Sequence, residues 1–204
     1  MGDTADKLVS DFRLLEREAA KLGLRLNRSK CELVGASVQT ISAFRSAGIE
    51  IPIVSLEKAF LLGSPLAHGS LDKAISEKND DLVRLSSRIK FLPAHDGLFL
   101  LRSALGIPKI MYLLRTAPCF QSALLETFDN VLLDSLQCLL NIDFSEPCRK
   151  QASLPIAYGG LGIRSTVSLA PSAFLASAAY SAELMSCILP IGFYVSPLTV
   201  GTAL

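Results

Sequence analysis

The chain has 204 residues, of which 50% are hydrophobic and only 19% are charged. This composition, with a mean hydropathy of +0.41, excludes a disordered or collagen-like chain and predicts one domain or two small folded units. Twenty Lys and Arg residues against nineteen Asp and Glu residues leave a net charge of +1, so overall charge gives no reason to expect a nucleic-acid-binding protein.

The first predicted element is an amphipathic helix near the N-terminus. Apolar residues recur at spacings of three and four between Leu8 and Leu22. Asp3 or Thr4 is suited to cap the start of this helix, because a short polar side chain can accept a hydrogen bond from a free N–H of the first turn. Gly23 is suited to end it.

Short extended segments follow the first helix. We predict one strand at residues 30–34 and another at residues 59–62, where a run of apolar residues precedes a Gly-Ser-Pro turn. The region between them, residues 38–52, has no clear period. The sequence therefore leaves that region open between helix and strand.

Three amphipathic helices are predicted next, and they form a small bundle. The first begins at Ser70, its expected cap, and runs to about residue 91. The second follows Pro93, and its pattern predicts a break at residues 106–108, because Pro108 removes a helix donor. The third covers residues 120–139.

The C-terminal part of the chain is nearly uncharged, since Glu183 is the only residue after Arg164 with a charged side chain at pH 7. We expect apolar helices there, and Pro171, Glu183, Pro190 and Pro197 break the apolar run. The charge-free residues 184–204 contain two prolines and two glycines, so a membrane span is not expected. Self-association through this apolar C-terminal tail is the favoured alternative.

Cysteine usage bears on the cellular compartment and on metal binding. The chain has five cysteines, an odd number, with no Cys-x-x-Cys pair and no secretory signal pattern. These features predict reduced cysteines in an intracellular protein (cytoplasm or nucleus). The two histidines, His68 and His95, complete no zinc-binding set, and we expect no metal or cofactor in this chain. The cysteines are Cys31, Cys119, Cys138, Cys148 and Cys187.

Two groups of basic residues are candidates for phosphate contacts. Arg25, Arg28 and Lys30 surround a short turn, while Arg84 and Arg88 lie four residues apart on a predicted helix. Such groups are either ordinary solvated faces or patches that neutralise the phosphates of a nucleic acid. Composition alone favours the first interpretation.

The remaining motifs give no catalytic set. Asp80 and Asp81 are adjacent, and neighbours on a helix point about 100° apart, so they do not converge on a pair of metal ions. We interpret them as part of a solvated face. The glycine-rich residues 159–162 lack the Gly-Lys-Ser/Thr ending of a phosphate-binding loop and predict a turn.

The order of the motifs nevertheless carries a family resemblance. Residues 22–32 read Leu-Gly-Leu-Arg-Leu-Asn-Arg-Ser-Lys-Cys-Glu and precede Phe-Leu-Leu-Gly at residues 60–63. A helical bundle follows, with Gly-Ile-Pro-Lys-Ile-Met-Tyr at residues 106–112, and Gly-Gly-Leu-Gly-Ile at residues 159–163 comes after it. This order resembles the C-terminal half of a reverse transcriptase, an RNA-directed DNA polymerase, of the non-LTR retrotransposon type.

The resemblance implies an α+β fold that is mostly helical. Residues 1–66 look like the end of a palm, with a helix and two or three short strands. Residues 67–145 look like a helical thumb, and residues 146–204 look like the post-thumb segment with apolar C-terminal helices.

The resemblance also implies roles for individual residues. Lys30 matches the motif lysine that acts as a general acid toward the pyrophosphate leaving group. The primer-grip-like residues are Phe60, Leu61, Leu62 and Gly63, and the nucleic-acid-binding candidates are Arg25, Arg28, Arg84, Arg88 and Lys109.

The family's two Mg²⁺ ions are held by Asp residues that precede the part resembled here, including those of a Tyr-x-Asp-Asp hairpin. Mg²⁺ is therefore expected only in an intact family member, and this chain is expected to be inactive alone. An RNA or DNA duplex is its expected partner, and no small-molecule ligand is predicted. The alternative function is that of a non-enzymatic helical interaction module that oligomerises through the apolar tail.

Overall fold

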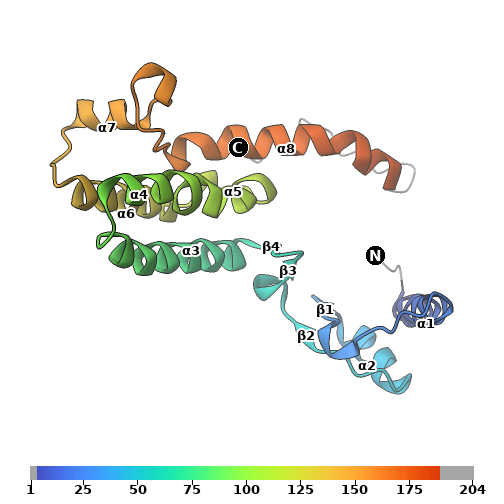
Figure 1. The fold of residues 1–204 in the computed structure, drawn as a ribbon. Coiled ribbons are helices and arrows are strands. Elements are labelled where there is room, and N and C mark those ends of the chain that lie inside the picture. Colours follow the sequence, from blue (N-terminus) through green and yellow to red (C-terminus); the bar gives the residue numbers. More distant parts are fainter. Residues whose placement is uncertain (1–3, 189–204) are drawn as a thin grey trace. The chain divides into compact units, whose positions relative to one another are not determined.

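The computed structural model of the chain describes residues 4–188 and is mostly helical over that range (Figure 1). The chain divides into two compact units, Met1–Phe60 and Leu61–Leu204, called unit 1 and unit 2 below. The expected class, α+β and mostly helical, is correct in its main feature. The described residues contain four strands, however, where two or three were expected, and each strand is only two residues long.

Unit 1 begins with helix α1 (Ala5–Lys21), close to the predicted bounds. Thr4 caps this helix, because its Oγ1 atom accepts a hydrogen bond from the Lys7 N–H at 3.3 Å. Gly23 follows the helix with a φ of +74°, a left-handed conformation that favours glycine. No residue of α1 is fully buried, so unit 1 covers the apolar face of this helix only in part.

Helix α2 (Val38–Ser46) occupies the region whose pattern the sequence left open. Ser37 caps it, because its Oγ atom accepts a hydrogen bond from the Thr40 N–H at 3.2 Å. The rings of Phe12 and Phe44 meet edge to face with centroids 5.9 Å apart, and this contact packs α1 against α2. Phe44 is the only fully buried residue of α2, which explains why the helical period is weak.

The strands of unit 1 are shorter than predicted. Strand β1 (Leu33–Val34) pairs in parallel with β2 (Ile53–Val54). The predicted strand at residues 30–34 was wrong in its first half, because Arg28–Lys30 form a 3₁₀ turn. Asn27 caps that turn by accepting a hydrogen bond from the Ser29 N–H at 3.1 Å, and this local bond competes with extended backbone.

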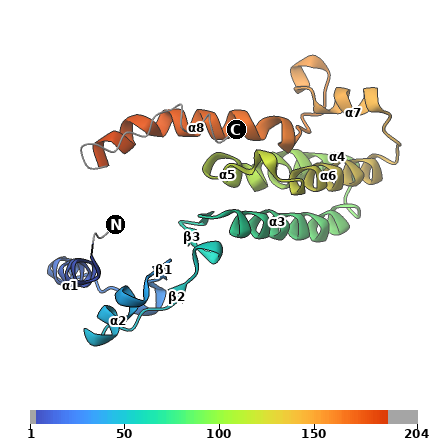
Figure 2. The ribbon, with the colours of Figure 1, turned by 180° about the vertical axis from the view of Figure 1, so that it is seen from behind.

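Unit 2 is a helical bundle in three layers. Figures 1 and 2 show α3 on one side of a layer made by α4, α5 and α6, with α8 on the other side, and the contacts of α3 with α6 and of α8 with α5 agree with this order. The core consists of side chains that these layers bury together, among them Ile75, Leu82, Leu101, Ile110, Leu114, Leu125, Phe128, Leu132 and Leu136. The helices are α3 (His68–Ile89), α4 (Ala94–Leu100), α5 (Ile107–Thr116), α6 (Leu124–Leu140), α7 (Glu146–Ser153) and α8 (Thr166–Ile188).

Two predicted helix starts in unit 2 were wrong by a few residues. Helix α3 begins at His68, so Ser70 lies inside its first turn instead of capping it. The Ser70 hydroxyl still serves the helix end, because it accepts a hydrogen bond from the Ala67 N–H at 3.2 Å. Helix α6 begins at Leu124, because Phe120 belongs to a separate 3₁₀ turn, Cys119–Gln121.

The predicted break at residues 106–108 is confirmed. A π-helical turn, Leu101–Leu105, ends at Gly106, whose ψ of −130° is not helical. The Gly106 N–H donates a hydrogen bond to the Leu101 carbonyl at 2.7 Å, and a Cβ atom on residue 106 would lie 2.9 Å from that oxygen. Pro108 lies in the first turn of α5, where the missing N–H has no helical acceptor in any case.

Helix α8 continues through Pro171. The carbonyl that loses its partner belongs to Val167, which is exposed, so water can replace the missing N–H. Residues 189–204, which make up most of the apolar stretch 184–204, lie outside the described residues.

One segment of unit 2 passes a length-and-composition test for a membrane span. This segment, Ala94–Thr116, comprises α4, the π-helical turn and α5. Leu101, Ile110 and Leu114 belong to it and are fully buried among the other helices, as the core of a helical bundle requires. The test is therefore weak evidence for a membrane location.

The five cysteines differ sharply in exposure, which gives a first prediction. Burial raises the pKa of the Cys119 thiol to about 11, whereas Cys138 and Cys148 are exposed. Because the thiolate is the reactive form, we expect iodoacetamide at pH 8 to label Cys138 and Cys148 and to spare Cys119 until the protein unfolds. Mass spectrometry of the labelled peptides checks this, and rapid labelling of Cys119 in the folded protein would contradict it.

Candidate nucleic-acid interface

Lys30, the candidate general acid, is the last residue of the 3₁₀ turn in unit 1. Its side chain is exposed and has no ion pair or hydrogen bond within the described part of the chain. The side chain is therefore available to a ligand but is not organised for proton transfer by unit 1 itself.

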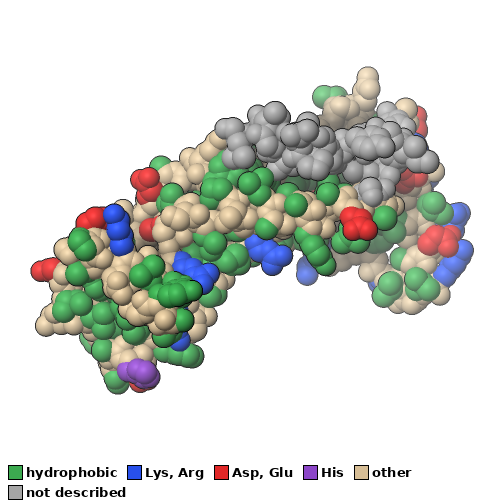
Figure 3. All heavy atoms as spheres, turned by 90° about the horizontal axis from the view of Figure 1, so that it is seen from above, with side chains coloured by type: hydrophobic (Ala, Val, Ile, Leu, Met, Phe, Trp, Pro, Cys, Tyr) green, Lys and Arg blue, Asp and Glu red, His purple; other side chains and the backbone are tan. Residues whose placement is uncertain are grey.

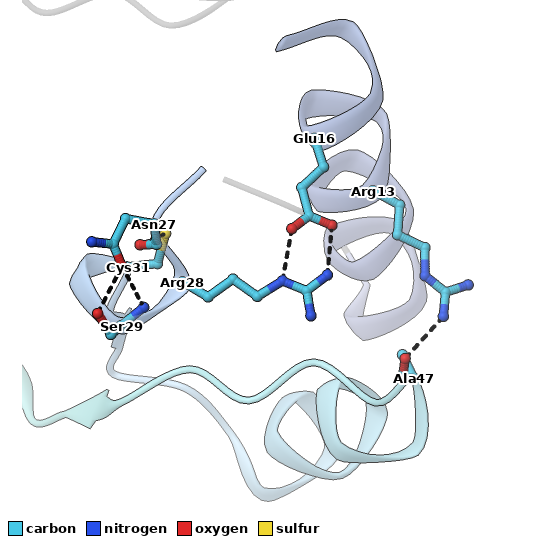
Figure 4. A network of polar contacts seen from close by, with 7 residues as sticks. All are labelled: Arg13, Glu16, Asn27, Arg28, Ser29, Cys31 and Ala47. Atoms are coloured by element: carbon cyan, nitrogen blue, oxygen red, sulfur yellow. Dashed lines mark hydrogen bonds and ion pairs between the residues drawn. The ribbon is translucent and has the colours of Figure 1, made fainter. Parts of the chain in front are cut away.

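Arg28, in contrast, is already engaged. Its Nε and Nη2 atoms donate to the two carboxylate oxygens of Glu16 at 2.7 and 2.9 Å, a bidentate pair that ties the turn to α1 (Figure 4). The hydrogen bond from Arg28 lowers the pKa of the Glu16 carboxyl. Arg28 can reach a phosphate only by giving up this pair, whereas the nearby Arg25 is exposed and has no ion pair with any residue in the range 4–188.

The primer-grip-like residues form the start of a tight hairpin. Strand β3 (Phe60–Leu61) pairs with β4 (Ser64–Pro65), and the two turn residues, Leu62 and Gly63, both have positive φ, +51° and +82°. Two-residue turns of this kind usually carry Asn-Gly, because a branched side chain is strained there by about 1–2 kcal/mol. Leu62 is nevertheless 90% exposed, so the turn presents an apolar tip to solvent.

Helix α5 holds this hairpin in place. The Tyr112 hydroxyl donates to the Leu62 carbonyl at 2.5 Å, and the Ser64 hydroxyl donates to the Thr116 carbonyl at 3.3 Å. Tyr112 and Thr116 lie one turn apart on α5, so both bonds attach the hairpin to the same helix. The strained turn is therefore fixed by its surroundings, which is typical of functional sites.

The basic candidates of unit 2 meet at Asp81. Arg84 donates to one Asp81 oxygen at 2.6 Å, and Lys109, from α5, donates to the other at 3.1 Å. The hydrogen bond from Lys109 makes the largest contribution to lowering the pKa of the Asp81 carboxyl, and the bond from Arg84 adds to it. Asp81, predicted to lie on a solvated face, is partly exposed, and it binds both cations there.

Arg88 lies one turn beyond Arg84 on α3, is exposed, and has no ion pair among the described residues. Arg84, Arg88 and Lys109, called the basic face below, are three cations from two helices, and two of them, Arg84 and Lys109, bind Asp81. Lys109 has a side chain only 16% exposed, so it mainly links α3 to α5. Arg84 and Arg88 are the members of this face that a ligand can reach.

The sequence did not indicate two side-chain contacts of unit 2. Tyr112 was part of a motif, but its bond to Leu62 joins residues 50 positions apart, and no local pattern signals such a contact. Asp129, on α6, accepts hydrogen bonds from the Thr166 N–H at 2.8 Å and from the Ser165 hydroxyl at 2.6 Å, and so caps α8 from another helix.

The exposed side of α8 bears on self-association. Tyr180 is 82% exposed and Leu184 is 60% exposed. Hydrophobic and uncharged side chains dominate the part of α8 that is visible in Figure 3. This composition keeps an interaction surface on α8 open as the alternative to a nucleic-acid interface.

No group of three or more His, Cys, Asp or Glu side chains that could hold a metal ion occurs within residues 4–188. Comparison of the chain with family models, with curated proteins and with solved structures finds no match.

Proposed function

We propose that this chain is a nucleic-acid-binding segment related to the end of the palm, the thumb and the post-thumb segment of a non-LTR reverse transcriptase, and that it is inactive alone as an RNA-directed DNA polymerase. Unit 1 and the hairpin correspond to the palm end in this proposal. Helices α3 to α6 correspond to the thumb. A duplex of RNA or DNA is the proposed ligand.

The observation that carries the proposal is the link between the hairpin and the basic face. Tyr112, which holds the Leu62 carbonyl, and Lys109, which binds Asp81, lie three residues apart on α5 and so on the same side of that helix. The apolar tip and the cations of α3 therefore belong to one supported surface of unit 2. A tip that contacts a strand end, together with cations farther along α3 that contact phosphates, suits a duplex.

Unit 1 adds two supporting observations. Lys30 is exposed and unpaired among the described residues, as a leaving-group acid in a larger active site requires. The apolar face of α1 is largely uncovered within unit 1, with Leu15 56% and Leu22 77% exposed. A palm proposal accounts for this face, because palm helices pack on a broader sheet than the two short strands present here.

The test is the binding of an RNA·DNA hybrid to the full chain, measured by fluorescence anisotropy over a range of salt concentrations. We expect log affinity to fall with log salt by about 0.9 for each phosphate contacted. The double variant Arg84→Glu, Arg88→Glu is expected to weaken binding of every sequence about tenfold or more, because two phosphate contacts become repulsive.

The matched control is Arg17→Glu, Lys21→Glu on α1, which makes the same change in charge at the same spacing of four residues. Both pairs also lie beside an acidic side chain, Asp81 or Glu18, so local charge effects are similar. Equal losses from both variants would mean that only overall charge matters. A flat salt response, with a particle size that rises with concentration in light scattering, would instead support the interaction module that uses α8.

A further inference from the structure

A second basic site lies in unit 2, in a hollow of about 340 Å³ between the break in the α4–α5 segment and the loop after α7. Two arginines line it, Arg102 from the π-helical turn and Arg164 from the end of the loop. Neither guanidinium has an ion pair or hydrogen bond within the described part of the chain, and no acidic residue lines the hollow. Two arginines without an ion pair among the described residues therefore line one small space, and Arg164 also lines a neighbouring hollow with Asp129 and Glu146.

Backbone hydrogen bonds hold the loop after α7 in place beside Arg102. The Gly162 N–H donates to the Leu154 carbonyl at 2.9 Å, and the Ile163 N–H donates to the Ala152 carbonyl at 3.1 Å. The stem of Arg102 packs where Gly162 has no side chain, since a Cβ atom there would lie 3.0 Å from the Arg102 Cδ atom. The guanidinium of Arg102 is thus held at the hollow by its own aliphatic part.

The rest of the lining is apolar. Leu132, Pro155 and Ile156 form part of the wall, together with Ile107 in the first turn of α5. The positive end of the dipole of α5, a helix of ten residues, adds to the attraction for an anion. A small inorganic anion would leave the apolar lining of the hollow exposed to water. The lining therefore favours an anion that also carries an apolar group.

From these observations we infer that the hollow binds a phosphate monoester carried on a nucleoside. A phosphate monoester has a charge of about −1.5 to −2 at pH 7, which matches two guanidinium groups that can each bind it with two hydrogen bonds. The apolar wall takes the base, and the volume is in the range of small-ligand pockets, about 300–1,000 Å³. The ligand is either a free nucleotide or the phosphorylated end of a strand, since both present the same chemistry.

Isothermal titration of the full chain with AMP, adenosine and inorganic phosphate tests the inference. We expect AMP to bind at least about tenfold more tightly than either component, because only AMP engages both the arginines and the wall. Arg102→Gln and Arg164→Gln are each expected to weaken AMP binding about tenfold. Glutamine keeps the Cδ carbon that packs on Gly162, and Arg164 is exposed, so both variants are expected to fold.

Arg115→Gln is the matched control, because Arg115 is an exposed arginine of α5 outside the hollow. Failure of AMP to bind at millimolar concentration, or equal affinities of wild type and both hollow variants, would overturn the inference. A 5′-phosphorylated single strand that binds better than its unphosphorylated form and competes with AMP identifies the strand end as the source. If the natural ligand is a free nucleotide, we expect the phosphorylated and unphosphorylated strands to bind with equal affinity.

The inference is independent of the proposed duplex interface. The variant Arg84→Glu, Arg88→Glu is expected to retain AMP binding, and Arg164→Gln is expected to retain the salt-dependent binding of the hybrid. Failure of one proposal is therefore distinguishable from failure of the other.

Discussion

Replacement of Gly160 by alanine is expected to lower the free energy of unfolding of unit 2 by about 3 kcal/mol. A Cβ atom at this buried position would lie 2.0 Å from the Leu154 carbonyl oxygen and 2.4 Å from its carbon. These are backbone atoms, and the same oxygen accepts the hydrogen bond from Gly162 at 2.9 Å, so neither side of the contact can move without disrupting the loop. Urea denaturation monitored by circular dichroism measures the change.

The adjacent Gly159 gives the control for this experiment. Its φ is +75°, its Cβ position meets only a side-chain nitrogen of Gln151 at 3.4 Å, and asparagine tolerates this backbone conformation. We expect Gly159→Asn to change the free energy of unfolding by less than about 1 kcal/mol. Similar values for the two variants would mean that the loop is not packed as described.

Replacement of Asp129 by alanine is expected to lower the free energy of unfolding by about 2–3 kcal/mol. Its carboxylate accepts hydrogen bonds from the N–H of Thr166 at 2.8 Å, the hydroxyl of Thr166 at 2.7 Å and the hydroxyl of Ser165 at 2.6 Å. Thr166 is fully buried, so its polar groups lose partners that water does not easily replace. Thermal and urea unfolding of the variant measure the effect.

Asp134→Ala is the comparison for Asp129→Ala, because Asp134 lies on the same helix, is exposed, and has no hydrogen bond or ion pair among the described residues. We expect its effect to stay within about 0.5 kcal/mol. If Asp129→Ala is as mild as Asp134→Ala, the cap of α8 does not depend on this carboxylate.

Local patterns predicted much of the helical structure. The spacing of apolar residues indicated α1 and α3, and Gly23 and Gly106 indicated where segments end, because these signals act within one or two helical turns. The boundaries at Ser70 and Phe120 were missed by a few residues. There, a side-chain hydrogen bond to Ala67 and a 3₁₀ turn at Cys119–Gln121 changed the helix start without altering the apolar period.

The contacts of the candidate site were harder to predict from local sequence patterns than the helices were. The sequence indicated Arg84 and Arg88 as a basic pair, and it indicated a strand at residues 59–62 with a primer-grip-like motif at residues 60–63, whereas the structure turns at Leu62 and Gly63. It did not indicate that Asp81 binds Lys109, or that Tyr112 holds Leu62, because each contact brings in a residue from another helix or from 50 positions away. Pairing of charges depends on which helix faces pack together.

The sequence by itself determined that this protein is mostly helical, where its main apolar faces lie, and that its C-terminal part is nearly uncharged. These properties follow from composition and from periods of three and four residues, which any helix displays along its own length. Only the tertiary structure decided which cations remain unpaired. Arg102 and Arg164 line one hollow because a π-helical turn and a glycine loop meet there, and such a meeting depends on the packing of the whole bundle.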